Sequence, residues 1–98
     1  MPSNIVEEVK NKKAVLIDVR RDDEWAKGHA AGALHLEIAK IEKGELPEIP
    51  KDKKIYLYCQ AGGRAGRAKN ILQKAGYSNA ENLGGLKNWQ SLGGEIEK

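Results

Sequence analysis

Residues 55–68 read Ile-Tyr-Leu-Tyr-Cys-Gln-Ala-Gly-Gly-Arg-Ala-Gly-Arg-Ala and hold the only cysteine of the chain, Cys59. The run from Ile55 to Tyr58 is apolar and rich in β-forming residues, so it predicts a buried strand. A glycine-rich turn follows, and from Ala68 to Ala75 apolar residues recur at helical i, i+3, i+4 and i+7 spacing until Gly76. The stretch therefore predicts a strand, a tight turn and a helix, with Cys59 at the end of the strand.

A second apolar run, Ala14–Val19, is rich in branched side chains and predicts another strand that is buried on both faces. Pro47 and Pro50 predict a surface loop over 46–54. Strands that alternate with helices at this spacing predict a small α/β fold, in which a mostly parallel central sheet is flanked by helices and the ligand site lies at the carboxyl ends of the strands. The shorter expected elements are a helix capped by Asn4, a helical turn over 22–27, a strand over 34–36, a helix from Ile38 to about Gly44, a strand over 79–83 and a helix over 86–92.

The net charge of +3 comes from 17 basic and 14 acidic residues that are interleaved along the chain. This pattern predicts no nucleic-acid face and indicates a mild attraction for small anions. No apolar run approaches the roughly 20 residues of a membrane span, so no membrane association is expected. With 98 residues, of which 40% are hydrophobic, the chain 1–98 is expected to be a single domain and a monomer.

A single cysteine can form neither an internal disulfide nor a multi-cysteine metal site, which leaves a buried inert thiol or a reactive one. Two histidines beside one thiol do not indicate zinc, and we expect no metal and no cofactor. A thiol before a helix N-terminus meets free backbone N–H groups, and the helix dipole favours its thiolate. Gly62 and Gly63 make it sterically possible for the backbone to curl around Cys59.

Two arginines follow the glycines. Arg64 is the candidate guanidinium fork for an oxyanion, whereas Arg67, one turn further along the helix, is expected to be a solvated or supporting charge. Asp18 ends an apolar strand, so we expect it to accept hydrogen bonds and to orient the backbone beside the site. Arg20 and Glu24 are expected to form a local ion pair in the connection that follows Asp18.

The aromatic and imidazole side chains are expected to have structural roles. Trp25 and Trp89 are interpreted as core or loop-packing residues. His29 follows a glycine in a turn, where a histidine bonded to the backbone is commoner than a general base, and His35 lies in a short strand with no acidic or sulfur partner nearby in sequence. Neither histidine is therefore placed in the candidate site.

Several motifs follow one another in a specific order. They are Leu16-Ile17-Asp18-Val19-Arg20, Glu24-Trp25, Gly28-His29, Gly32-Ala33-Leu34-His35-Leu36, the cysteine loop, and Asn82-Leu83-Gly84-Gly85-Leu86-Lys87-Asn88-Trp89. Over about Ala14 to Trp89, their order and spacing resemble those of the single-domain rhodanese sulfurtransferases. A second set of residues looks most similar to the phage-shock protein E group, whose members are exported to the bacterial periplasm: Cys59-Gln60-Ala61-Gly62, Ala68-Lys69, Ile71-Leu72, Gly76-Tyr77, Glu81-Asn82 and Gly84-Gly85-Leu86-Lys87.

This resemblance implies a rhodanese-like fold and a six-residue loop, Cys59 to Arg64, that holds a persulfide on the catalytic Cys59. It implies thiosulfate as the small-molecule sulfur donor and cyanide or a thiol as the acceptor. In the family the arginine that closes the loop is often followed by serine, whereas Ala65 stands here. The residues expected to bind the substrate are Gln60, Ala61, Gly62, Gly63, Arg64 and Ala65, and those expected to support the site are Asp18, Arg20 and Arg67.

Two other functions remain open from the sequence. Cysteine phosphatases also hold an anion in a loop before a helix, but their spacing requires the arginine at position 65, where Ala65 stands. A non-catalytic module that keeps the fold and binds sulfur is the second alternative, although such domains typically lose the nucleophile. The stretch Met1–Glu8 lacks the pattern of a signal peptide, so the expected location is the cytoplasm, or the periplasm if an export leader has been removed.

Overall fold

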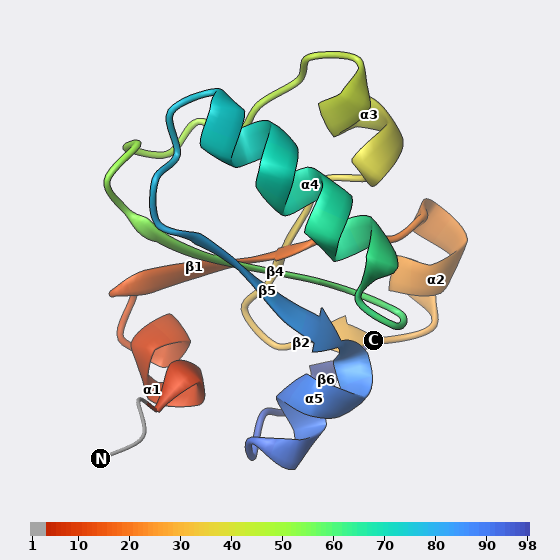
Figure 1. Ribbon diagram of the computed structural model, residues 1–98. Helices are drawn as coiled ribbons and strands as arrows, with labels where there is room; N and C mark the ends of the chain where they lie inside the picture. The colour runs from red at the N-terminus through yellow and green to blue at the C-terminus, as the bar shows by residue number, and fades with distance from the viewer. Residues whose placement is uncertain (1–3) are drawn as a thin grey trace.

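A computed structural model describes residues 4–98 and is shown in Figure 1. Residues 1–3 of the stretch that was inspected for an export leader lie outside the described residues. The longest helix has 12 residues, and no helix in the described part of the chain combines the length and apolarity that a bilayer crossing needs. The elements are α1 (Ile5–Lys10), β1 (Ala14–Asp18), α2 (Asp22–Ala26), β2 (His29–Ala30), β3 (Leu34–His35), α3 (Ile38–Glu42), β4 (Lys54–Cys59), α4 (Gly63–Lys74), β5 (Ala80–Gly85), α5 (Leu86–Ser91) and β6 (Ile96–Glu97).

The central sheet has four strands in the order β3-β1-β4-β5, and every pair in it is parallel. This confirms the prediction of an α/β fold with a mostly parallel sheet. A second, antiparallel pair joins β2 to β6, with Ala30 opposite Ile96. This pair could not be predicted from the sequence, because strands of two residues are too short to show an alternating pattern.

Helices cover both faces of the sheet: α3 and α4 lie on one face, and α1 and α5 lie on the other (Figure 1). Side chains of β4 alternate between the two layers, as the period of a strand requires. Leu57 and Cys59 belong to the hydrophobic cluster under α3 and α4, whereas Tyr56 and Tyr58 belong to the cluster that includes Trp89 of α5. Both layers therefore meet on β4, the strand that carries the cysteine.

The described helix ends follow from the local sequence. Asn4 caps α1 as predicted, because its Oδ1 accepts a hydrogen bond from the Glu7 N–H at 3.1 Å. The helix α4 begins at Gly63, after Gly62 adopts a φ of +98°, a left-handed conformation that glycine reaches without steric cost. The chain thus turns sharply from β4 into α4 within three residues, 60–62.

A register shift between β4 and β5 brings the end of β5 beside the cysteine. Leu57 pairs with Asn82, but Tyr58 pairs with Gly84, so one residue of β5 is left over as an irregularity. The φ of Gly84 is +96°, which explains glycine at this position. As a result, Gly85 lies directly opposite Cys59 in the ladder.

Candidate functional site

The strand order places a crevice at the carboxyl ends of β1 and β4. From β1 the chain leads through α2 and β2 to β3 on one side of the sheet, whereas β4 lies on the other side of β1. In parallel sheets such a reversal leaves room for a ligand between the two diverging connections. Here the segment after Asp18 and the loop after Cys59 flank this position, and Asp18 pairs with Tyr58 in the register.

The sulfur of Cys59 is surrounded by backbone N–H groups of its own loop. The residue is buried, with 1% of its surface exposed, and its Sγ accepts a hydrogen bond from the Gly62 N–H at 2.8 Å. Burial by itself raises the pKa of the thiol, but hydrogen bonds from the N–H groups of Ala65, Ala61, Gly62 and Arg64 together outweigh it, and the pKa is lowered. The loop therefore favours a thiolate at Cys59.

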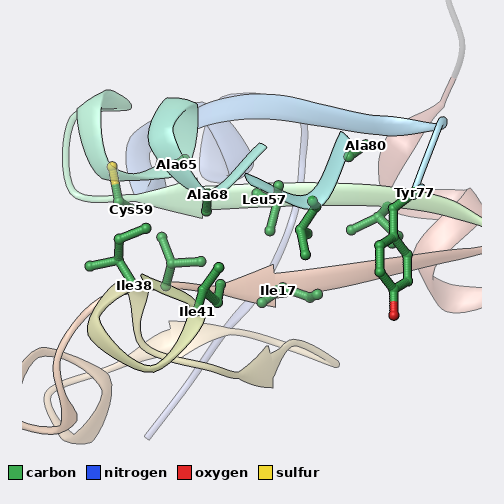
Figure 2. Close-up of a cluster of buried hydrophobic side chains, with 12 residues drawn as sticks. Ile17, Ile38, Ile41, Leu57, Cys59, Ala65, Ala68, Tyr77 and Ala80 are labelled. Carbon is green, nitrogen blue, oxygen red and sulfur yellow. The ribbon is translucent and has the colours of Figure 1, made fainter. Parts of the chain in front are cut away.

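Figure 2 shows the same cysteine from the side of the core. Its sulfur lies at one end of the hydrophobic cluster, beside Ala65, and Tyr77 lies at the opposite end. The cysteine is thus both a core residue and the first residue of the loop, so its burial alone does not distinguish an inert thiol from a reactive one. The polar surroundings of the sulfur favour the reactive interpretation.

The end of β5 supports the loop from below. Asn82 donates from Nδ2 to the Gly62 carbonyl at 2.9 Å, and its Oδ1 accepts from the Gly84 N–H at 2.8 Å. A Cβ on Gly85 would collide with the carbonyl oxygen of Gln60, so only glycine fits where β5 passes the loop. From the sequence, Asn82 and Gly85 belong only to a family motif, since nothing local indicates that Asn82 contacts Gly62, 20 residues away.

Asp18 and Arg20 form a buried network beneath the site. Asp18 accepts from the Arg20 N–H at 2.8 Å, from the Arg20 Nη2 at 2.8 Å and from the Tyr58 hydroxyl at 2.6 Å. Arg20 also donates from Nη2 to the Gly28 carbonyl at 2.7 Å, and the Tyr58 hydroxyl accepts from the Ala30 N–H at 2.9 Å. Asp18 therefore accepts hydrogen bonds, as predicted, and one of them comes from the backbone of Arg20.

The predicted ion pair between Arg20 and Glu24 is wrong. Arg20 is held by Asp18, which lies two residues away and reaches around the turn at the end of β1. Glu24, on α2, instead accepts two hydrogen bonds from Arg64, from Nη1 at 2.7 Å and from Nη2 at 3.0 Å. The two residues are 40 positions apart, so a pairing based on sequence proximity could not find this contact.

The electrostatics of the Glu24–Arg64 pair reach the cysteine. The hydrogen bond from Arg64 is the main reason why the pKa of Glu24 is lowered to about 2. The pKa of Arg64 is raised, first by the hydrogen bond to Glu24 and to a lesser extent by the Cys59 thiolate. Arg67 Nε instead lies 3.6 Å from a carboxylate oxygen of Glu42, and both of these side chains are exposed. Of the two arginines, Arg64 is the one whose charge acts on the sulfur.

Trp25 stacks on both histidines, with ring centroids 3.5 Å from His29 and 4.6 Å from His35. His29 Nδ1 hydrogen-bonds to the Trp25 carbonyl at 3.2 Å, which confirms the expectation of a histidine bonded to the backbone. His35 Nε2 hydrogen-bonds to the Arg20 carbonyl at 2.7 Å. Within residues 4–98, His35 also lies close enough to Asp22 and Glu37 for the three to share a metal ion, a group that does not include Cys59.

Two cavities are relevant to the site. A cavity of about 490 Å³ lies beside the loop and is lined by residues that include Arg20, Glu24, Gln60 and Leu86. A second cavity of about 540 Å³ is mostly apolar and lies at α1 and the start of β1, the end of the strand opposite to Asp18. Of these two cavities, only the first is lined by a residue of the cysteine loop, Gln60, which directly follows Cys59.

Comparison with known proteins agrees with this geometry. Residues 1–92 match the family model of the rhodanese-like domain. The chain is 42% identical over 87 residues to the uncharacterized protein YqhL of Bacillus subtilis, covering 88% of this chain and 66% of that protein. It is 36% identical over 72 residues to the thiosulfate sulfurtransferase PspE of Escherichia coli, covering 72% of this chain and 69% of that protein. The chain thus spans about two thirds of the length of each relative.

A solved structure gives the same result for the fold. The crystal structure of the Rhodanese_3 like domain of the Alr3790 protein from Anabaena superposes with a TM-score of 0.77 at 29% identity, covering 87% of this chain and 99% of that domain. The fold, the cysteine loop between β4 and α4, and the match along residues 1–92 all agree with a rhodanese-like domain. The chain belongs to the rhodanese-like family, whose members include sulfurtransferases.

Proposed function

We propose that this protein is a thiosulfate sulfurtransferase that carries sulfur as a persulfide on Cys59. The observation that carries the proposal is the set of N–H groups around one sulfur: Gly62 donates to Sγ at 2.8 Å, and the surrounding loop lowers the pKa of the thiol. The relative PspE, a thiosulfate sulfurtransferase, supports the choice of donor. The substrate-binding role belongs to the loop from Gln60 to Ala65, largely through its backbone.

The chemistry needs two displacements. In the first, the Cys59 thiolate attacks the outer sulfur of thiosulfate, the S–S bond of thiosulfate breaks, and sulfite leaves with the bonding electron pair. The new terminal persulfide sulfur is anionic and is stabilised by the same N–H groups, as an oxyanion hole stabilises oxygen. In the second, cyanide or a thiol attacks this outer sulfur, which restores the Cys59 thiolate. Such a cycle gives ping-pong kinetics.

The direct test incubates the protein with thiosulfate and cyanide, alongside Cys59→Ser. The wild type should form thiocyanate, and after thiosulfate alone its mass should increase by one sulfur atom. The serine variant should do neither, because a hydroxyl has no thiolate to attack with at neutral pH. Equal thiocyanate formation by both proteins, or none by either without any added sulfur, would overturn the proposal.

The two arginines are expected to differ in their effect on the donor. Arg64→Ala should raise the KM for thiosulfate by about ten-fold, since Arg64 closes the loop and its charge acts on the sulfur. Arg67→Ala should change the KM by less than about two-fold, because this side chain is exposed and faces Glu42. Steady-state kinetics with both variants measure the two KM values. A larger increase in Arg67→Ala than in Arg64→Ala would assign the anion-binding role to Arg67.

A phosphatase activity is the alternative function, because cysteine phosphatases also hold an anion in a loop between a cysteine and a helix. Counting from Cys59, the arginine comes one position earlier than a cysteine phosphatase requires, and the buried Ala65 stands at the required position. A shorter loop surrounds a single sulfur atom more closely than a tetrahedral phosphate. Hydrolysis of an aryl phosphate by the wild type, lost in Cys59→Ser, would favour the phosphatase over the sulfurtransferase.

A further inference from the structure

Arg64, which closes the Cys59 loop, is already paired with a carboxylate. Both of its Nη atoms donate to the Glu24 carboxylate, at 2.7 and 3.0 Å, which is the two-pronged geometry in which arginine also binds oxyanions. Glu24 lines the cavity beside the loop, and its side chain is partly exposed. A carboxylate therefore holds the two Arg64 nitrogens that would bind an anionic donor in the two-pronged geometry.

Glu24 is itself fixed in place. Its Oε1 accepts from the Arg21 N–H at 3.1 Å, so it closes the first turn of α2 while it holds Arg64. The Arg21 side chain contributes little, since its Nε lies 3.9 Å from Glu24 and pairs more closely with Asp23 at 3.1 Å. Glu24 thus bridges the starts of α2 and α4 through defined contacts.

We propose that Glu24 competes with the incoming anion for Arg64 and thereby limits how tightly the Cys59 loop binds an anionic sulfur donor. A free guanidinium beside the loop would add a full positive charge to the N–H groups that already attract an anion. With Glu24 in place, this charge is neutralised. A dianion such as thiosulfate must then displace the Glu24 carboxylate to bind the Arg64 guanidinium in addition to the N–H groups of the loop. Glu24 is therefore a positioning residue that sets donor affinity.

The proposal rests on the proposed function only where thiosulfate is the donor, so the main measurement uses sulfate, an unreactive dianion. Alkylation of Cys59 by neutral iodoacetamide is followed at increasing sulfate concentration, and the concentration that halves the rate is recorded. In Glu24→Gln this concentration should fall about five-fold, because an amide keeps the shape and the Oε1 acceptor but no longer neutralises Arg64. The KM for thiosulfate should fall by a similar factor while kcat changes by less than about two-fold.

Three further variants make the result specific. Glu24→Gln combined with Arg64→Ala should protect less well than Glu24→Gln alone at the same sulfate concentration, because no released guanidinium is present. Glu42→Gln is the matched control, because Glu42 pairs with Arg67, which lies on α4 as Arg64 does, and makes no ion pair with Arg64. Its sulfate protection should match that of the wild type. Glu24→Ala, which also loses the contact to the Arg21 N–H, should tighten sulfate binding in the same direction, so the test does not depend on one substitution.

The outcomes separate the two proposals. If Glu24→Gln leaves the protecting sulfate concentration unchanged or raises it, while circular dichroism shows a folded protein, Glu24 does not compete for Arg64. If sulfate protection tightens as expected but the wild type forms no thiocyanate, the competition stands and the thiosulfate activity fails. If thiocyanate forms and Glu42→Gln moves sulfate protection as much as Glu24→Gln, the effect is general electrostatics and the competition is refuted.

Discussion

Two acid–arginine pairs connect the region after β1 to β4 and α4, and they differ in burial. The Asp18 and Arg20 side chains are 0% and 4% exposed, and their network includes the Tyr58 hydroxyl. The Glu24 and Arg64 side chains are 20% and 26% exposed, and Glu24 lines the cavity beside the loop. The same chemical pair therefore occurs once as an internal support and once at the entrance of the site.

The difference indicates which pair can take part in function. Charges without access to water are costly to separate, so Asp18 and Arg20 must stay paired for the chain to remain folded. A pair at the surface contributes little to stability, because water can replace either partner. Glu24 can consequently release Arg64 at small cost, whereas Asp18 cannot release Arg20. We expect stability effects from the first pair and effects on ligand binding from the second.

Asp18→Asn tests the buried pair and should have the largest effect. The substitution removes the negative charge and turns an amide group toward donors that require an acceptor, which leaves the Arg20 charge uncompensated. Breaking a buried pair in this way typically costs about 3–5 kcal/mol. The free energy of unfolding in urea should fall by that amount. A loss below about 1 kcal/mol would show that the network is not a support of the fold.

A second variant keeps this prediction testable where Asp18→Asn alone does not fold. Asp18→Asn combined with Arg20→Gln removes both charges, and it should be more stable than Asp18→Asn alone since no buried charge remains unpaired. A double variant that is less stable than the single one would contradict the coupling of the two side chains. The free energies of unfolding of the four proteins complete the cycle.

Tyr58→Phe should have an intermediate effect. The hydroxyl donates to Asp18 at 2.6 Å and accepts from the Ala30 N–H at 2.9 Å, and burial together with Asp18 raises its pKa. Its removal leaves the Ala30 N–H without this partner inside the protein, at a cost of about 1–3 kcal/mol. Tyr56→Phe is the control: its hydroxyl donates to Glu8 in a partly exposed contact, so it should cost less. Equal losses would mean that burial does not decide the effect.

Much of this fold could be predicted from the sequence, because the relevant signals are local. The apolar runs at β1 and β4, the prolines of the loop before β4 and the cap at Asn4 each act within a few residues, although β4 begins at Lys54, one residue earlier than predicted. The position of Cys59 between a strand and a glycine turn also follows from neighbouring residues. What these features share is that each depends on the chain's own period or on a single backbone conformation.

The parts that could not be predicted depend on contacts between distant segments. Glu24 was assigned to Arg20 because the two are close in sequence, but the turn after β1 brings Asp18 to Arg20 and leaves Glu24 facing Arg64. The support of the loop by Asn82 depends on a register shift between β4 and β5 that no local pattern encodes. Side-chain pairing across 20 to 40 residues is set by topology, so it becomes visible only in three dimensions.

Of the substitutions at the two acid–arginine pairs, Glu24→Gln should lower the free energy of unfolding least. The pH dependence of this loss tests whether it comes from the ion pair between Glu24 and Arg64. The pKa of Glu24 is about 2 in the folded protein and about 4.3 in an unfolded chain, so the folded state binds fewer protons between these values. The stabilisation is therefore complete above about pH 4.5 and is lost as the pH falls toward 2. At pH 7 the free energy of unfolding of the wild type should exceed that of Glu24→Gln by up to about 1 kcal/mol, less than the full pKa shift would give, because water screens a partly exposed pair.

Urea unfolding of both proteins at several pH values between 7 and 2 measures this difference. It should shrink steadily below pH 4.5, because protonation of Glu24 produces the neutral side chain that glutamine mimics. The Glu42→Gln difference should stay below about 0.5 kcal/mol throughout, as expected for one 3.6 Å contact between exposed side chains. A Glu24→Gln difference that does not change with pH would mean that the contact with Arg64 stabilises the protein by shape, and the contrast between an internal support and a releasable pair at the entrance would then be lost.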